Sequence, residues 1–536
     1  MNYRSEIDGL RALAVLPVIL FHAGFEWFSG GFVGVDVFFV ISGYLITTII
    51  ISELAEDNFS LLKFYERRAR RILPALFFVM GTCLPFAWFW LTPADLKDFG
   101  QSLVAVSTFS SNILFWIESG YFATDSELKP LLHTWSLAVE EQYYIIFPLF
   151  LLVTWRFGLK IVLILISLFF VTSLLAAHWG SFNHPSATFF LSHTRVWELL
   201  MGVFIAFYLK YNFYIKNHLV NEVLSLLGFG MIIFSIVNYD SSTPFPSFYA
   251  LVPTIGTALL ILSAVEGTIL NKLLSIRPIV GLGLISYSAY LWHQPVLAFS
   301  RHRQLGEISD VLLIFLCLFS ILIAWLSWRF VERPFRNKEK FSQKNIFTLS
   351  AVFISLFSSI GLIAHLNLSL IKTYDSETIR LSKAQQSSLK LTEKCEISLS
   401  GNDLELILKD CFIGDRNTKP SFAVVGDSHA RSLIPGFDVF GKKSGLSGFS
   451  LAHATCFPTL GEGHYLPLDI VQKKCLKVRE NILSLLRKDL IPEKIFISAR
   501  WAFAFEQTRF DNLEGGVEYG LENKTFITSL SNQLGN

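Results

Sequence analysis

Two ionisable side chains, Arg11 and His22, lie inside the first apolar stretch of the chain, GLRALAVLPVILFHAG. Eleven residues correspond to about three helical turns, so both side chains point to roughly the same face of a helix. Ionisable groups at membrane depth are costly and therefore indicate function, and histidine can exchange a proton near neutral pH. His22 is a candidate base, the alternative being a structural histidine bonded to a backbone carbonyl.

A carboxylate follows in the second apolar stretch, GGFVGVDVFFVISGYLI, at Asp36. Because a carboxylate can fix the tautomer of an imidazole, we predict that Asp36 orients and polarises His22. The alternative is an interfacial aspartate that caps the start of a helix.

Arginines cluster in FYERRARRILP, residues 64–74, ahead of the third apolar stretch. Guanidinium groups bind phosphates in a bidentate manner and keep their charge, so this arginine cluster is a candidate site for a phosphate-bearing substrate. The alternative is a charge cluster that only sets membrane orientation. Further along, HTWSLAVEEQYY places the adjacent glutamates Glu140 and Glu141 at a membrane boundary, where packing does not explain them.

A serine follows a buried strand in SFAVVGDSHARSL. This pattern predicts a tight turn at Gly426 and a helix that begins near His429. Ser428 would then lie beside a helix N-terminus, which suits a nucleophile and an oxyanion. An ordinary strand-to-helix turn is the alternative.

The amino-acid composition indicates that a membrane part and a soluble part position these candidate residues. Of 536 residues, 52% are hydrophobic and 16% are charged, whereas soluble domains carry about 25% charge. Residues 369–536 hold 41 charged side chains and residues 1–368 hold 47, so a long apolar part precedes a shorter soluble one. A net charge of +2 does not indicate nucleic acid as a partner.

The apolar part predicts eleven membrane spans, each of roughly 17–25 residues. Positive residues favour cytoplasmic loops, and this bias is strongest if the N-terminus is inside, the C-terminal domain is outside and residues 100–117 do not cross. The spans lie near residues 10–27, 32–51, 73–91, 139–155, 160–177, 191–209, 223–238, 249–265, 280–299, 311–330 and 346–366.

The soluble part contains four of the six cysteines. Three pairings are possible, and proximity along the chain favours Cys395 with Cys411 and Cys456 with Cys475. None has the spacing of a metal site, so we expect no metal. Disulfides suit the oxidising outer side, in agreement with the loop charges.

Several ordered segments resemble the acyltransferase-3 family of membrane acyltransferases, and the match covers residues 1–340. They are YRSEIDGLRALAVLPVILFHAG, GGFVGVDVFFVISGYLIT, RRARRILP, HTWSLAVEEQYY, YSAYLWHQP and FVERPFR. The GDSH segment resembles the SGNH hydrolase-like domain fused to bacterial glycan O-acetylases, which implies that Ser428 is the nucleophile.

The resemblance also implies roles and partners. Arg11 and His22 match the family's arginine–histidine pair, Arg68 and Arg71 its R-x-x-R pair, and Glu140 or Glu141, with Glu141 favoured, its glutamate. The donor would be acetyl-CoA or another acyl-CoA, with no permanently bound cofactor. The acceptor would be a polysaccharide or lipid-linked glycan such as lipopolysaccharide O-antigen or peptidoglycan, outside the bacterial inner membrane.

The SGNH family takes its acid and base from a late D-x-x-H, which is absent after Ser428 in this chain. The sequence therefore predicts a polytopic α-helical membrane domain over residues 1–340, an additional span and linker over 341–368, and an incomplete α/β SGNH-like domain over 369–536. Arg11, Arg68 and Arg71 would bind the donor, and His22, set by Asp36, would act as base or transient acyl carrier. A flippase for a lipid-linked sugar and an inactive truncated homologue are the alternatives.

Overall fold

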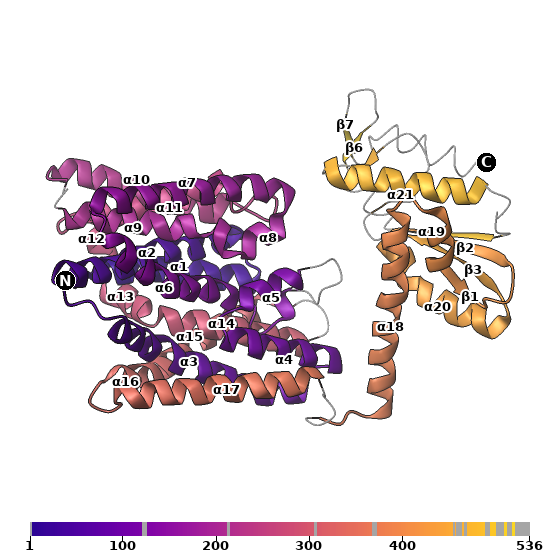
Figure 1. The fold of residues 1–536 in the computed structure, drawn as a ribbon, viewed down its shortest axis with the longest axis horizontal. Coiled ribbons are helices and arrows are strands. Elements are labelled where there is room, and N and C mark those ends of the chain that lie inside the picture. The colour runs from indigo at the N-terminus through magenta and orange to yellow at the C-terminus, as the bar shows by residue number, and fades with distance from the viewer. Residues whose placement is uncertain are drawn as a thin grey trace. The chain divides into compact units, whose positions relative to one another are not determined.

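The computed structural model divides into two units, Met1–Tyr374 and Asp375–Asn536, and the regular elements among the described residues of the first unit are all helices. The structure describes residues 3–119, 126–211, 215–304, 308–366, 372–453, 456, 464–465, 469–487, 494–499, 509–511 and 517–519. The long helices of the first unit run side by side (Figure 1).

The α-helices of the first unit overlap the eleven predicted apolar stretches, although residues 280–299 are divided between two helices. They are α1 Ser5–Ala23, α2 Gly34–Ala55, α3 Leu61–Trp90, α4 Pro93–Ser107, α5 Ser111–Ile117, α6 Thr134–Trp155, α7 Leu159–Asn183, α8 Pro185–Phe190, α9 Val196–Lys210, α10 His218–Asn238, α11 Leu251–Ser263, α12 Ile269–Leu274, α13 Arg277–Leu284, α14 Ser286–Arg303, α15 Asp310–Ser327, α16 Arg333–Arg336 and α17 Gln343–Leu366.

Seven helical segments in the described part of the chain are long and apolar enough to cross a membrane. They are Glu26–Ala55, Leu61–Trp90, Thr134–Trp155, Leu159–Asn183, His218–Asn238, Asp310–Arg336 and Gln343–Leu366. This confirms a polytopic helical membrane unit, and the count of eleven spans stays a prediction. Residues 93–117 form the two short helices α4 and α5, and Gly100 of α4 packs closely on Gly361 and Ala364 of α17.

Glycines bring α2 and α9 together. A Cβ atom at Gly43 would lie 1.9 Å from the carbonyl oxygen of Leu199, and one at Gly202 would lie 2.2 Å from that of Val40. Both neighbouring atoms belong to the backbone, so they have little freedom to move away. Small residues at such positions allow close helix packing in membranes, and this packing sets how α2 presents Asp36 and Ser42.

We expect Gly43→Ala to lower the melting temperature of the detergent-solubilised protein, because overpacking costs about 1–3 kcal/mol. Gly230→Ala on α10 is the matched control, since a Cβ atom there would meet nothing within 4 Å. Thermal unfolding followed by tryptophan fluorescence measures both variants. Equal melting temperatures for the two would show that the α2–α9 contact tolerates a methyl group.

The second unit combines helices with two sheets. Its elements are α18 Ser376–Leu399, α19 Leu404–Asp410, β1 Phe412–Gly414, β2 Pro420–Gly426, α20 Ser428–Ser444, β3 Ser447–Ala452, β4 His464–Tyr465, α21 Asp469–Arg487, β5 Lys494–Ser498, β6 Arg509–Asp511 and β7 Val517–Tyr519. The larger sheet has the order β1-β3-β2-β5, with β2 parallel to β3 and β5, and β1 antiparallel to β3. Strands β4, β6 and β7 form a small antiparallel sheet.

The predicted strand, turn and helix around GDSH are confirmed. The strand β2 ends at Gly426, which has φ of +153° and whose added Cβ would lie 1.8 Å from the carbonyl oxygen of Ser498. Only glycine fits this turn, and α20 begins at Ser428 immediately after it. The prediction that the domain is incomplete refers to its C-terminal elements. Most of these residues lie outside the described part of the chain, so the prediction stays a prediction.

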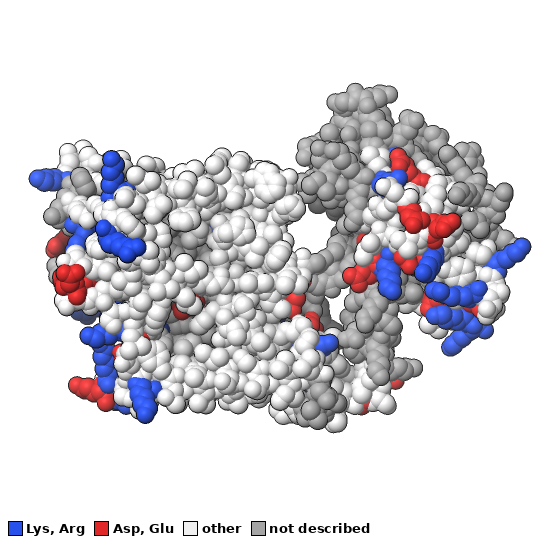
Figure 2. Space-filling view, viewed as in Figure 1, with Lys and Arg blue, Asp and Glu red and all other residues white. Residues whose placement is uncertain are grey.

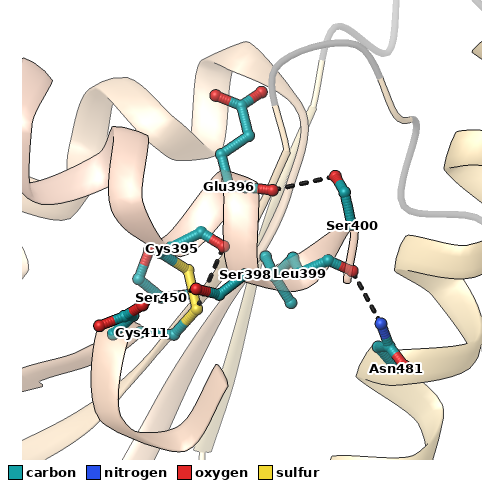
Figure 3. The surroundings of a disulfide bond; sticks show 9 residues. Cys395, Glu396, Ser398, Leu399, Ser400, Cys411, Ser450 and Asn481 are labelled. Atoms are coloured by element: carbon teal, nitrogen blue, oxygen red, sulfur yellow. Dashed lines mark hydrogen bonds between the residues drawn. A yellow bond between two sulfur atoms is a disulfide. The ribbon is translucent and has the colours of Figure 1, made fainter. Parts of the chain in front are cut away.

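Both predicted disulfides are present: Cys395 bonds Cys411, and Cys456 bonds Cys475. Figure 3 shows the first bridge, which joins α18 to the residue that precedes β1. Near it the Asn481 amide donates to the carbonyl oxygen of Leu399 at 2.8 Å and so attaches α21 to the end of α18.

We expect a membrane-impermeant thiol reagent to leave all four of these cysteines unlabelled on intact cells until reductant and denaturant are added. The reason is that a disulfide has no thiol, and Cys395 and Cys411 are also fully buried. Mass spectrometry of the labelled peptides measures this. Labelling without reductant would refute the pairing, and protection of the domain from external protease, with outer barriers opened, would refute the external location.

Candidate active site

The arginine cluster at the start of α3 divides into two pairs with different surroundings. Arg67 pairs with Glu53 at 3.0 Å. Arg70 pairs with Glu66 at 2.8 Å, and its other nitrogens donate to the carbonyl oxygens of residues 335 and 341. Arg68 and Arg71 make no ion pair with a carboxylate in the described part of the chain, and both line a cavity. The three-residue spacing of Arg68 and Arg71 puts them on one helix face.

This cavity has a volume of about 190 Å³ and lies among α1, α2, α3, α6 and α14. Arg11 joins Arg68 and Arg71 in its lining, and Glu140 is the one carboxylate among its described lining residues. Arg11 also contacts Asp8 at 3.3 Å. Much of the remaining wall is apolar: Val35, Phe38, Phe39, Ile41, Leu45, Ile46, Ile49, Ile72 and Leu137. The cavity is therefore cationic in one part and hydrocarbon-lined in another.

The structure separates the two adjacent glutamates. Glu140 lines the cavity and accepts hydrogen bonds from the Ser42 hydroxyl at 2.7 Å and from the Tyr144 hydroxyl at 3.4 Å. Glu141 is buried and is not among the described residues that line the cavity. Consecutive helical residues diverge by about 100°, so only one of them can face the cavity. Glu140 is the glutamate that faces the cavity, whereas the family resemblance favoured Glu141 for the functional role.

His22 lies near the end of α1 and is partly exposed. Its Nδ1 is 3.0 Å from the carbonyl oxygen of Val18. A carbonyl oxygen only accepts a hydrogen bond, so Nδ1 carries the hydrogen in the neutral ring and Nε2 carries the lone pair. This is the tautomer that a base at Nε2 requires. The Arg301 guanidinium donates to the carbonyl oxygen of His22 at 2.6 Å and holds this end of α1 in place.

Helix α14 connects the cavity to the surroundings of His22. Tyr287 and Tyr290 line the cavity, and His293, three residues further on, has its ring centroid 5.1 Å from that of His22. The Tyr290 hydroxyl donates to the carbonyl oxygen of His133 at 2.8 Å and is 2.6 Å from the Ser136 hydroxyl. His22 therefore lies close to the helical turn that follows the last cavity-lining residue of α14.

The predicted contact between Asp36 and His22 is wrong. Asp36 is fully buried and pairs with Arg195 at 3.3 Å, while Arg195 also contacts Glu198 at 3.2 Å. Four aromatic rings surround the guanidinium of Arg195, those of Phe39, Trp135, Phe189 and Phe245. A buried arginine needs a counter-charge, and the packing of α2 on α9 turns Asp36 toward Arg195. A backbone carbonyl, rather than a carboxylate, sets the His22 tautomer.

Sequence reasoning did not assign Arg195 as the partner of Asp36 or His293 as the neighbour of His22. Both residues could have been noticed, since ionisable groups within apolar helices must find partners. The partner of each residue could not be predicted from the sequence, because it depends on which helices are adjacent. In the described part of the chain, no cluster of three or more histidine, cysteine or acidic residues could hold a metal ion.

Ser428 lies at the carboxyl end of β2, where the Asp427 carboxylate accepts the backbone N–H of His429 at 2.8 Å. His453 follows the neighbouring strand β3, and its backbone N–H donates to the carbonyl oxygen of Gly426 at 3.0 Å. The ring of His453 directs Nδ1 to Glu396 at 3.3 Å. No hydrogen bond joins the hydroxyl of Ser428 to a base within the described ranges.

We therefore expect Ser428→Ala to leave the hydrolysis of a small acetyl ester by the full chain unchanged, because a serine hydroxyl without a hydrogen-bonded base is a poor nucleophile. A chromogenic acetyl ester measures the rate. His453→Ala serves as the companion variant. Turnover that both substitutions abolish would identify His453 as the base and overturn this expectation.

Family models match both units of the chain. The chain belongs to the acyltransferase-3 family, whose model, described as an acyltransferase domain, matches residues 4–329. A second model, described as an SGNH domain fused to AT3 domains, matches residues 394–534.

Three similar proteins carry the name O-acetyltransferase. The chain is 33% identical over 352 residues to "O-acetyltransferase OatA" of Staphylococcus aureus strain NCTC 8325, a match that covers 63% of this chain and 58% of that protein. It is 30% identical over 420 residues to "Peptidoglycan O-acetyltransferase OatA" of Listeria monocytogenes, a match that covers 73% of this chain and 66% of that protein. It is 32% identical over 356 residues to "Putative peptidoglycan O-acetyltransferase YrhL" of Bacillus subtilis, covering 63% and 55%.

The chain thus matches less than two thirds of the length of the Staphylococcus and Bacillus proteins. No solved structure matches this chain.

Proposed function

We propose that this protein is a membrane O-acetyltransferase that moves an acetyl group from cytoplasmic acetyl-CoA to a hydroxyl of an extracytoplasmic glycan. The observation that carries the proposal is the cavity that leads from Arg68 and Arg71, which have no carboxylate partner among the described residues, toward the turn of α14 beside His22. His22 supplies a lone pair at Nε2, because Val18 fixes the ring tautomer. The names of the relatives and the family membership agree with this activity.

The arginines suit the donor's phosphates, and the apolar wall suits its pantetheine arm. Arg11, Arg68 and Arg71 give the cavity an excess of positive charge over Glu140, the one carboxylate among its described lining residues. Charge-assisted bonds from guanidinium to phosphate are among the strongest polar contacts in proteins. Arg11 and His22 are eleven residues apart on α1, or about 16 Å along the helix axis, a distance that an extended donor molecule must bridge.

In the proposed reaction His22 acts as a general base. Nε2 of His22 removes the proton of the attacking hydroxyl, the new O–C bond to the acyl carbon forms, and the C–S bond of the thioester breaks. The departing thiolate of CoA then takes the proton from Nε2, so the ring returns to its starting state. The attacking hydroxyl in this scheme belongs to the glycan, since a relay through Ser428 would need a base that no described residue places in hydrogen-bond reach of its hydroxyl.

We place the N-terminus in the cytoplasm and the SGNH domain outside the bacterial inner membrane. Figure 2 shows Lys and Arg gathered at the end of the helical unit where the N-terminus and α16 lie, which fits the cytoplasmic side. The two disulfides of the second unit suit an oxidising compartment. For the acceptor, the relatives' names favour peptidoglycan over lipopolysaccharide O-antigen.

The test uses the full chain in proteoliposomes with acetyl-labelled acetyl-CoA and soluble peptidoglycan fragments, with O-antigen oligosaccharide in a parallel reaction. We expect label on the peptidoglycan fragments that mild alkali releases, as it does an O-acetyl ester. Movement of a lipid-linked sugar across the bilayer with no label retained on any glycan would instead identify a flippase.

A further inference from the structure

A second buried histidine, His293 of α14, contacts the proposed base. Nε2 of His293 is 3.3 Å from Nδ1 of His22, and the side chain of His293 is fully buried. Neither the donor cavity nor the proposed reaction uses this residue. The contact between His293 and His22 therefore suggests a further role for His293.

The hydrogen-bond partners fix the tautomer of His293. Its Nδ1 is 2.6 Å from the carbonyl oxygen of Tyr290, so Nδ1 carries the hydrogen and Nε2 the lone pair. That lone pair faces Nδ1 of His22, which already carries a hydrogen because of Val18. The Nδ1–H of His22 is thus shared between two acceptors, the oxygen of Val18 and Nε2 of His293.

A second acceptor matters most when His22 is protonated. The ring then becomes a cation, and hydrogen bonds from a charged donor are roughly twice as strong as neutral ones. Asp36, the expected counter-charge, pairs with Arg195, and among the described residues the charged group that contacts His22 is the cationic Arg301. Nε2 of His293 is a more basic acceptor than a peptide oxygen, so it is the partner that can share the proton's charge.

We infer that His293 is a positioning residue for the proposed acyl transfer: it holds the Nδ1–H of His22 and stabilises the imidazolium that forms when His22 takes a proton. This inference rests on the proposed function. No covalent bond to His293 forms, and the proton on Nε2 of His22 returns to the leaving thiolate as described above.

The experiment compares two polar substitutions in the full-length protein, His293→Gln and His293→Asn. The amide of glutamine reaches the place of Nε2 and can accept from His22, whereas that of asparagine reaches only the place of Nδ1. We expect His293→Asn to lower kcat for acetyl transfer at least about tenfold, with the KM for acetyl-CoA unchanged, and His293→Gln to restore most of the rate. His302→Gln is the matched control on the same helix, since the ring of His302 hydrogen-bonds the carbonyl oxygen of Leu128 and, among the described residues, has no contact with His22.

Equal kcat values for His293→Asn and the unchanged protein would overturn the inference. It would also be overturned if both variants lost kcat equally and raised the KM, because that pattern indicates a packing role. Absence of acetyl transfer by the unchanged protein would refute the proposed function itself, so the two failures are distinguishable.

Discussion

Acetylation of the glycan should fall to background in His22→Ala while the protein still inserts into the membrane. Removal of the imidazole takes away the lone pair that we assign as the base, and general-base catalysis contributes typically 10²–10⁴-fold. Insertion should be unaffected, since alanine makes the helix more apolar than histidine does. Quantifying alkali-labile acetate on purified peptidoglycan, together with the amount of protein in the membrane fraction, measures both effects.

His184→Ala is the matched control for this substitution. His184 lies exposed between α7 and α8, and its ring contacts Trp179 at a centroid distance of 5.7 Å. The control removes one histidine from the same unit and leaves the surroundings of His22 intact. Wild-type acetylation in His22→Ala would make His22 a structural histidine bonded to Val18, which is the alternative that the sequence also allowed.

The sequence predicted the parts of this protein whose physical cause is local. Apolar runs predicted where the helices lie, because a run of about 20 apolar residues has few other stable conformations in lipid. The turn at Gly426 and the helix after it followed from one short pattern, and both disulfides followed from proximity along the chain. The choice of Arg68 and Arg71 among the arginines of α3 came from the family resemblance, and both of them line the cavity.

The sequence could not predict which distant side chains meet. Asp36 was assigned to His22 because the two are close along the chain, yet α2 packs on α9 and brings Asp36 to Arg195. The contact between His22 and His293 joins residues 271 positions apart. Glu140 and Glu141 differ only in direction around one helix, and the neighbouring helices decide which of them reaches the cavity.

Replacing Arg68 and Arg71 together by glutamine should raise the KM for acetyl-CoA strongly and leave the KM for the acceptor glycan nearly unchanged. Both arginines line the cavity and have no carboxylate partner in the described part of the chain, so a phosphate can engage them fully. Each lost charge-assisted bond costs about 1.5–3 kcal/mol, and 1.4 kcal/mol corresponds to a tenfold change in affinity. We therefore expect at least about a tenfold increase in KM for each arginine removed. Inside-out vesicles with varied acetyl-CoA at saturating acceptor give the measurement.

The control for this pair is Lys63→Gln with Arg67→Gln, which removes two positive charges from the same helix without touching the cavity. Lys63 is exposed and Arg67 is paired with Glu53. If the arginines of α3 act only by setting orientation, both double variants should behave alike, because the positive-inside bias depends on the number of charges near the loop. If Arg68 and Arg71 bind the donor, only their substitution raises the KM, and the control keeps the wild-type dependence on acetyl-CoA. Identical KM values for the two double variants would assign these arginines to topology alone.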